Sequence, residues 1–168
     1  TVPQRVRAVR KMILARTEEQ RRVAIEDLLP MQIEDFGAIF KAVGTLPITM
    51  RLIDPPLHVF LPSSPEEMAE TAVDLEENEF QINERIERLR ESNPMLGHRG
   101  CRLGVSFPEI YQMQVEAIIK AAKMVEDSKG KKVTPSIMIP LVTLPKELEL
   151  IRVACQAQLE RTCAEVDF

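Results

Sequence analysis

The segment Ile48-Thr49-Met50-Arg51-Leu52-Ile53-Asp54-Pro55-Pro56 decides the fold class of this 168-residue chain. Apolar residues occupy alternate positions in it, which predicts a β-strand over residues 48–53. The two prolines must end this strand, because proline has no backbone N–H to donate to a neighbouring strand. We therefore expect Arg51 near the C-terminal end of the strand and Asp54 just beyond it. Spacing alone fits a surface ion pair as well as a ligand-facing arginine held in place by a carboxylate.

Two further segments predict strands, and each is followed by a helix. Residues 137–142 are nearly all apolar, which is typical of a strand buried on both faces, and residues 100–105 fit a third strand. Strands that alternate with helices indicate an α/β fold with a parallel sheet. Because a complete (β/α)8 TIM barrel typically needs about 250 residues, we expect a partial barrel here. It would be an arc of about three β/α units with extra helices, and sites in such barrels lie at the C-terminal ends of the strands.

Helix signals fill most of the remaining sequence. Thr17–Gln20 has capping-box spacing and begins a helix that we expect to end at Pro30, before a separate helix over residues 31–43. Ser64–Glu67 combines a capping serine with a proline and a glutamate in the first turn, and it predicts a helix that breaks once near Asp74. Other helices are predicted over residues 5–16, from Ser106 to Lys129, and from Pro145 past Leu159.

The segment Asn93–Gly104 is rich in glycine and arginine. It holds three of the six glycines of the chain, one of its two histidines, and the arginines Arg99 and Arg102. Glycine allows a backbone to approach a ligand closely, and the planar guanidinium group matches carboxylate and phosphate. We therefore interpret the segment as part of an anion site. The glycines at positions 97, 100 and 104 would allow the backbone to lie close to the anion.

The composition excludes several classes of protein. The net charge of −4, from 22 basic and 26 acidic residues, argues against a general nucleic-acid binder. No apolar run approaches the ~18 residues that a membrane span needs, and no signal peptide is visible. Three cysteines without metal-ligand spacing favour a reduced intracellular setting over a disulfide framework. The chain begins at Thr1 without an initiator Met and stops at Phe168 soon after a helix pattern, as we would expect of a piece of a larger protein.

Three parts of the sequence resemble the C-terminal phosphoenolpyruvate/pyruvate domain of the pyruvate, phosphate dikinases, within the phosphoenolpyruvate-utilising enzyme family. They are Met50–His58 with Phe60–Pro62, Asn93–Gly104, and Ile137–Val142 with Glu147–Glu149. Residues 24–40 are similar as well, so the resemblance covers nearly the whole chain. Phosphoenolpyruvate synthase and enzyme I of the sugar phosphotransferase system share part of these patterns. They lack the runs Asp54–His58 and Gly97–Gly104.

The resemblance implies a (β/α)8 barrel in an enzyme that interconverts ATP, phosphate and pyruvate with AMP, diphosphate and phosphoenolpyruvate through a phosphohistidine on a separate swivelling domain. Arg51 matches a family arginine on the phosphate and carboxylate side of the substrate, and Arg99 matches another that binds phosphate. Asp54 matches an aspartate that supports this arrangement. Such arginines stabilise the charge of the transferring phosphoryl group, whose reaction depends mainly on positioning and charge. The resemblance also implies a homodimeric parent in the cytoplasm, or in the plastid stroma of a plant, with neither nucleic acid nor membrane as a partner.

Other working parts of this family do not match the sequence. The Mg²⁺-binding Glu and Asp of the family and its cysteine acid/base lie C-terminal to the matched segment, and none of the three cysteines here matches that cysteine. Neither His58 nor His98 lies in the phosphohistidine context. Arg16-Thr17-Glu18 copies the letters of a family site segment, but its helical context indicates a coincidence. We therefore expect no catalytic residue and no metal ligand in this chain, and no activity of the chain alone.

Two alternatives stay open. The first is a structural or interaction fragment without ligand binding, which length and composition do not separate from a ligand-binding piece. The second is a fragment of phosphoenolpyruvate synthase, which the sequence contexts of Asp54–Pro56 and Cys101 disfavour.

Overall fold

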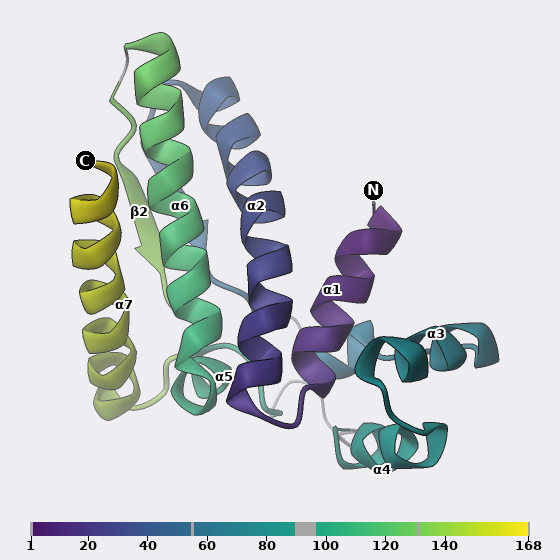
Figure 1. Cartoon of the computed structure of the whole chain (residues 1–168). Helices are drawn as coiled ribbons and strands as arrows, with labels where there is room; N and C mark the ends of the chain where they lie inside the picture. The colour runs from purple at the N-terminus through teal and green to yellow at the C-terminus, as the bar shows by residue number, and fades with distance from the viewer. Residues whose placement is uncertain (1, 55, 90–96, 131, 168) are drawn as a thin grey trace. The chain divides into compact units, whose positions relative to one another are not determined.

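The computed structural model describes residues 2–54, 56–89, 97–130 and 132–167 (Figure 1). The chain divides into two compact units, and each is described here by itself. The first consists of Thr1–Leu28 with Pro55–Arg99, and the second of Leu29–Asp54 with Gly100–Phe168. Helix α2 (Glu18–Val43) runs through the first boundary between them.

The first unit is helical in the part that the structure describes. Its elements are α1 (Val2–Leu14), the beginning of α2, the 3-10 helix η1 (Leu57–Phe60), α3 (Pro65–Leu75) and α4 (Glu79–Leu89). Its apolar core is formed by Leu14, Leu61, Ile82 and Ile86, with Met68 and Leu75 among the residues packed against it. The core is small, so polar contacts at its edge contribute to holding α1 against α3 and α4.

Two carboxylates of α3 bind arginines of α1. Arg7 forms a two-pronged ion pair with Asp74, which holds the pKa of the Asp74 carboxyl below its ordinary value. Arg10 is buried and lies 3.0 Å from Glu67. The backbone amide of Ser63 also donates to Glu67, and this hydrogen bond, together with Arg10, lowers the pKa of Glu67 to about 2. Both carboxylates are therefore ionised at neutral pH.

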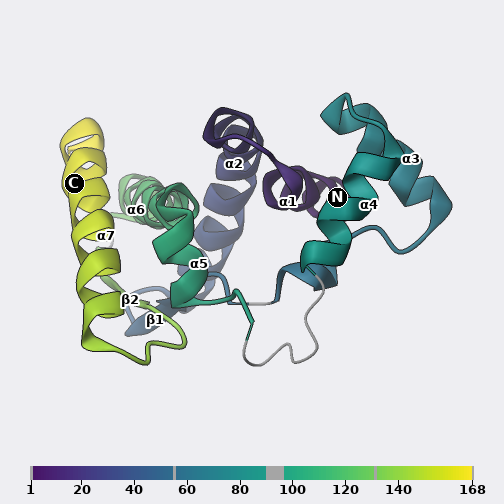
Figure 2. The ribbon, with the colours of Figure 1, turned by 90° about the horizontal axis from the view of Figure 1, so that it is seen from below.

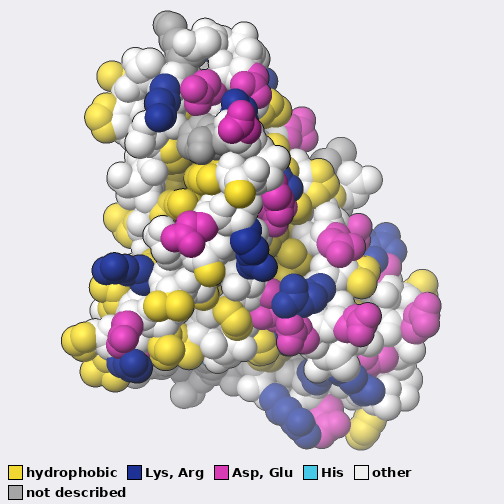
Figure 3. Space-filling view, turned by 60° about the vertical axis from the view of Figure 1, so that its left-hand side comes forward, with side chains coloured by type: hydrophobic (Ala, Val, Ile, Leu, Met, Phe, Trp, Pro, Cys, Tyr) yellow, Lys and Arg dark blue, Asp and Glu magenta, His cyan; other side chains and the backbone are white. Residues whose placement is uncertain are grey.

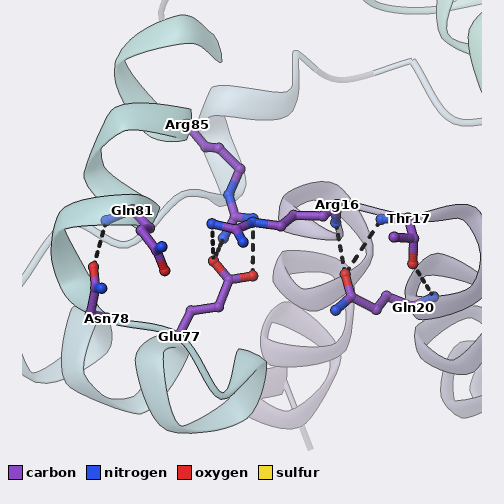
Figure 4. A network of polar contacts seen from close by, with 7 residues as sticks. All are labelled: Arg16, Thr17, Gln20, Glu77, Asn78, Gln81 and Arg85. Atoms are coloured by element: carbon purple, nitrogen blue, oxygen red, sulfur yellow. Dashed lines mark hydrogen bonds and ion pairs between the residues drawn. The ribbon is translucent and has the colours of Figure 1, made fainter.

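A third ion-pair group has Glu77 at its centre, in the turn between α3 and α4, and joins it to Arg16 in the turn between α1 and α2 and to Arg85 on α4 (Figure 4). Glu77 lies 3.1 Å from Arg16 and 2.6 Å from Arg85. Thr17, which follows Arg16, caps α2: its hydroxyl accepts a hydrogen bond from the backbone amide of Gln20 at 3.1 Å. The Gln20 side chain accepts in return from the amide of Arg16 at 2.9 Å. The predicted capping box is confirmed, and the Arg16–Thr17 pair has a structural explanation.

The second unit contains the sheet. Its elements are the remainder of α2, β1 (Ile48–Arg51), α5 (Cys101–Ser106), α6 (Pro108–Lys129), β2 (Pro135–Met138) and α7 (Pro145–Val166). The two strands pair in parallel, with Ile48 opposite Pro135 and Arg51 opposite Met138. Helix α6 lies beside α7 in both ribbon views (Figures 1 and 2). Helix α6 supplies most of the core, whose largest buried side chains are Tyr111, Phe40, Leu52, Leu103, Ile118 and Ile151.

The strand predicted over residues 100–105 is wrong, because this segment forms helix α5. Its apolar residues at alternate positions fit a strand, but over six residues they fit a short buried helix as well. The amide of Gly104 donates to the carbonyl of Gly100 at 3.2 Å, and that of Phe107 donates to Leu103 at 2.8 Å. The described residues thus form a mostly helical structure with a two-stranded parallel sheet, consistent with an α/β fragment. The partial barrel stays a prediction.

Two predicted boundaries near prolines are also wrong. Helix α2 does not end at Pro30 but continues to Val43 with the proline inside it. Pro30 is exposed, as is Glu26 one turn earlier, so the carbonyl that loses its hydrogen bond remains accessible to water. Strand β2 covers residues 135–138 rather than 137–142, because Pro140 lacks a backbone donor and Leu141 adopts φ +59°. Its residues alternate between half-buried and exposed, so it is not buried on both faces.

Most other helix boundaries agree with the prediction. The Ser64 hydroxyl caps α3 by accepting from Glu67, and the predicted break after Asp74 lies between α3 and α4, where Glu76 adopts φ +54°. Helix α6 begins at Pro108, two residues after the predicted start, and Phe107 is the residue that precedes its first turn.

The second unit exposes apolar side chains along β2 and α7. They are Met138, Leu144, Leu148 and Val153. The space-filling view turns the side that carries α7 forward and shows hydrophobic side chains gathered there (Figure 3). Within the described ranges, no helix combines the length and the apolar character that crossing a membrane requires.

Candidate functional site

The candidate site lies in the second unit, where strand β1 ends. Arg51 is the last residue of β1, and Asp54 follows three residues later. The Nη1 atom of Arg51 lies 3.8 Å from Oδ2 of Asp54, which makes them an ion pair rather than a close hydrogen bond. The Arg51 side chain is 62% exposed and that of Asp54 only 9%. A buried carboxylate thus holds a guanidinium group whose larger part faces solvent, an arrangement that suits capture of an anion.

Helix α6 holds the backbone between these two residues. The amide of Ile53 donates to Oε1 of Gln114 at 2.7 Å, and the Tyr111 hydroxyl donates to the carbonyl of Ile53 at 3.2 Å. The other end of the Gln114 amide donates to Gln32 at 3.2 Å, so residues of α6 and α2 meet at this peptide. Both backbone polar groups of Ile53 are therefore satisfied by side chains just beyond the end of the strand.

The Tyr111 phenol is a neutral donor in this arrangement. Burial raises its pKa well above the ordinary value, and the nearby thiol of Cys101 and carboxylate of Asp54 raise it further. A phenol with a raised pKa keeps its proton at neutral pH. Its hydrogen bond to Ile53 therefore does not change across the physiological pH range.

Residues 93–96 of the glycine-rich segment lie outside the described residues, and Gly100 and Cys101 of its described part contact the residues that follow β2. The amide of Cys101 donates to the carbonyl of Pro140 at 2.9 Å, and its thiol donates to the carbonyl of Leu141 at 3.0 Å. Gly100 adopts φ +57°, and a Cβ there would lie 3.0 Å from both Leu141 Cβ and Pro140 O. Only glycine fits this position without strain. At Gly100 the backbone therefore lies close to the chain after β2, while the predicted close approach to a ligand stays a prediction.

Gly104 has a packing role in the structure. A Cβ at this position would lie 2.5 Å and 2.6 Å from two ring carbons of Tyr111. The missing side chain makes room for the tyrosine ring, and the predicted role of Gly104 in an anion site stays a prediction. Gly104 thereby allows Tyr111 to reach the carbonyl of Ile53.

The cysteine of this region is buried and unreactive. Burial raises the pKa of the Cys101 thiol, and the Glu147 carboxylate adds to this effect. Glu147 itself has a lowered pKa, because the amides of Leu144 and Thr143 each donate to it at 2.9 Å. In the same unit, burial raises the pKa of Cys155 to about 11. Thiols that remain protonated at neutral pH are poor nucleophiles.

The structure brings two of the three predicted site residues together. Arg51 and Asp54 form the ion pair in the second unit, whereas Arg99 is the last residue of the first unit. A peptide bond links Arg99 to Gly100, which keeps the two Cα atoms about 3.8 Å apart. The inclusion of Arg99 in one site with Arg51 stays a prediction. The expectation that this chain contributes no metal ligand also stays a prediction. In the part of the chain that the structure describes, no three His, Cys, Asp or Glu side chains cluster as metal ligands would.

Sequence reasoning missed the side chains that hold Ile53. Gln114 lies on the buried apolar face of α6, four residues after Ile110 and four before Ile118. A polar residue on such a face must find a buried partner, and this was the signal available in the sequence. Tyr111 gave a weaker signal, since its ring is apolar and only the hydroxyl needs a partner.

The family model of the PEP-utilising enzyme, PEP-binding domain, matches residues 7–167, where PEP is phosphoenolpyruvate. The chain belongs to this family. It is 50% identical over 166 residues to the chloroplastic pyruvate, phosphate dikinase of Mesembryanthemum crystallinum. The aligned region covers 98% of the chain and 17% of that relative. The pyruvate, phosphate dikinase of Rhizobium meliloti (strain 1021) is 46% identical over 161 residues, 96% of the chain and 18% of the relative.

A third relative, the pyruvate, phosphate dikinase of Clostridium symbiosum, is 44% identical over 148 residues, 88% of the chain. The chain spans 17% of that protein, so in all three cases it matches less than a fifth of the relative. The resemblance inferred from the sequence is confirmed. The PEP-binding family match includes both units, the Arg51–Asp54 pair and the Arg99–Gly104 segment.

Proposed function

We propose that this chain is the part of a pyruvate, phosphate dikinase that supplies phosphate-binding arginines to the phosphoenolpyruvate/pyruvate site. The observation that carries the proposal is the exposed guanidinium group of Arg51, held by the buried carboxylate of Asp54 at the C-terminal end of β1. Membership of the PEP-binding domain family and the names of the relatives support the substrate class.

Charge arithmetic supports a role for a second arginine. A phosphate monoester carries roughly two negative charges at neutral pH, and the carboxylate of phosphoenolpyruvate adds another. Arg51 and Asp54 together carry no formal net charge, so this pair alone cannot neutralise such a ligand. Arg99 supplies the further cation in the proposal, and its peptide bond to Gly100 links it to the segment that contacts Pro140 and Leu141 after β2. Arg51 then orients the ligand through its planar fork, while Asp54 orients Arg51.

The remaining parts of the reaction belong elsewhere in the parent enzyme. The phosphohistidine domain, the Mg²⁺ ligands and the proton-transfer group all lie outside this chain in the proposal. When bound, Mg²⁺ would add charge stabilisation at the transferring phosphoryl group. The chain alone is therefore inactive, and the parent acts as a cytoplasmic or plastid homodimer. In all of this the arginines bind and position the substrate, and they form no covalent bond with it.

The test replaces the two arginines in the full-length enzyme that contains this chain. Arg51→Ala and Arg99→Ala should each lower phosphoenolpyruvate formation about 10- to 100-fold, because each removes charge-assisted hydrogen bonds to the ligand. Phosphorylation of the enzyme by ATP should persist. Arg88→Ala is a matched control, because Arg88 is also exposed and pairs only locally with Glu84 along α4. Normal pyruvate phosphorylation in either of the first two variants would refute the site.

A second candidate is a packing module that binds no ligand. The exposed apolar side chains on β2 and α7 favour it, since they suit contact with other protein surface. Titration of the chain with phosphoenolpyruvate separates the two. Binding that Arg51→Ala abolishes supports the first proposal, whereas no binding at millimolar concentration leaves only the packing role for this piece by itself.

A further inference from the structure

We infer that Gln114, with Tyr111 beside it, is a positioning residue for Arg51 and Asp54. This inference rests on the proposed function, because it concerns how that substrate site is held in shape. The juxtaposition that carries it is at the single residue Ile53, which lies between the two site residues and whose backbone N–H and C=O are both bound by side chains of α6.

The contacts at Ile53 are short and buried. The distance from Ile53 N to Gln114 Oε1 is 2.7 Å, and Gln114 is only 6% exposed. The strand ladder ends one residue earlier, where the amide of Leu52 donates to the carbonyl of Met138 at 3.0 Å. Beyond that point no strand partner fixes the backbone in the part of the chain that the structure describes, so the side chains of α6 take over at the residue that precedes Asp54.

Gln114 is itself held in one orientation. Its Nε2 atom donates to Oε1 of Gln32 on α2 at 3.2 Å, which leaves Oε1 of Gln114 to accept from Ile53. Tyr111 lies one helical turn before Gln114 on α6, and Gly104 leaves the space that its ring occupies. Helices α2, α5 and α6 thus converge on the backbone of Ile53. Hydrogen bonds to both its N–H and its C=O fix the two successive peptide units on either side of this residue, and the second of them leads directly to Asp54.

A small movement here affects binding more than folding. The Nη1 atom of Arg51 lies 3.8 Å from Oδ2 of Asp54, close to the limit of an ion pair. A shift of the carboxylate by about 1 Å away from Arg51 would therefore weaken the pair. Misplacement of a binding group by about 1 Å is sufficient for losses approaching 10²-fold in an enzyme. The same hydrogen bonds would also serve a purely structural role, and the experiment must therefore separate position from stability.

The experiment uses the full-length enzyme and three substitutions. Gln114→Leu keeps the volume and removes the acceptor for Ile53, and it should lower kcat/KM for phosphoenolpyruvate about tenfold, mainly through KM. Gln114→Glu keeps an acceptor oxygen for the amide of Ile53. If the Gln32 side-chain amide rotates, its NH₂ group can donate to the second carboxylate oxygen, so this variant should keep most of the activity that Gln114→Leu loses. Tyr111→Phe keeps the ring and should give a smaller loss of the same kind. Phosphorylation of the enzyme by ATP should be unchanged in all three.

Gln158→Leu is the matched control. Gln158 is also a buried glutamine of the second unit. Its hydrogen-bond partners are Glu116 on α6 and Arg161 and Thr162 on α7, and none of these three residues is hydrogen-bonded to Ile53 in the contacts given above. Gln158→Leu should lower the melting temperature without changing KM for phosphoenolpyruvate. An unchanged KM and kcat for folded Gln114→Leu would overturn the inference, as would an equal KM change in Gln158→Leu.

Two outcomes guard against ambiguity. If Gln114→Leu fails to fold, Tyr111→Phe and Gln114→Glu decide, and the inference is overturned if Tyr111→Phe leaves KM for phosphoenolpyruvate unchanged. If the unsubstituted full-length enzyme does not interconvert pyruvate and phosphoenolpyruvate, the proposed function fails, and the positioning role fails with it. An active unsubstituted enzyme with unaffected variants refutes the positioning role alone.

Discussion

The substitution Gly104→Ala tests the packing beneath the candidate site. The added Cβ would lie 2.5 Å and 2.6 Å from ring carbons of Tyr111 and 3.1 Å from a third. Distances this short require one partner to move. The ring is almost fully buried, and its hydroxyl is bound to Ile53, so it cannot rotate away without losing that hydrogen bond.

The expected cost combines three effects. Overpacking a buried site costs about 1–3 kcal/mol, and a weakened hydroxyl hydrogen bond adds about 0.5–1.5 kcal/mol. Alanine recovers up to about 1 kcal/mol, because Gly104 lies in a helix and glycine is the poorer helix former. We therefore expect a net decrease of about 0.5–4.5 kcal/mol in the free energy of unfolding.

Gly37→Ala is the matched control for this change. Gly37 is also a buried helical glycine of the same unit, and its Cβ would lie 2.5 Å from Met124 Cε. That atom is the far end of a flexible side chain, which moves aside easily. Gly37→Ala should therefore be neutral or stabilising by up to about 1 kcal/mol. Urea unfolding of the chain, followed by circular dichroism, measures both. A Gly104→Ala chain as stable as the unsubstituted one would refute the reasoning.

Two further predictions concern the first unit. Asp74 and Glu67 have lowered pKa values in the folded chain, about 2 for Glu67, so their stabilisation is complete above the unfolded pKa of about 4 and is lost as pH falls through the folded values. Urea midpoints between about pH 6 and pH 2 should fall with acidification, and Asp74→Asn with Glu67→Gln should flatten that dependence; an equally steep curve in the double variant would contradict it. Glu77→Gln should cost about 1–3 kcal/mol because Arg85, 18% exposed, loses its carboxylate. Arg16→Ala removes the more exposed partner of Glu77 and should lower the free energy of unfolding by less than about 1 kcal/mol. Equal decreases in the two variants would contradict the claim that the Glu77–Arg85 pair stabilises the unit more than the Glu77–Arg16 pair.

The sequence predicted the elements with strong local signals. The capping contacts of Thr17 and Ser64, the first strand and the position of Arg51 at its end follow from residues within a few positions of each other. Gly44, expected just after α2, adopts φ +68° and donates to Phe40 at 2.9 Å. These features depend on local backbone geometry, so sequence spacing is sufficient to find them.

The failures occurred where tertiary packing decides between local alternatives. Residues 101–106 have apolar side chains at spacings that fit a strand or a helix, and their contacts with α6 and α7 accompany the helix. Pro30 is a strong local signal for a helix end, yet α2 continues past it, and the helix buries Leu28 before the proline and Phe40 nearly three turns after it. No window of the sequence contains the partners that settle these two cases.

The candidate site shows the same division. Arg51 and Asp54 were found by spacing and by resemblance, whereas Gln114 is 61 residues from the backbone that it holds and could be found only through its misplaced polarity. The packing role of Gly104 also depends on residues that are distant in the sequence. Gly104 serves Tyr111, Tyr111 serves the carbonyl of Ile53, and Ile53 precedes Asp54. Through these contacts Gly104 supports the end of β1, and we expect substitutions at Gly104 to change the position of Asp54 and its ion pair with Arg51.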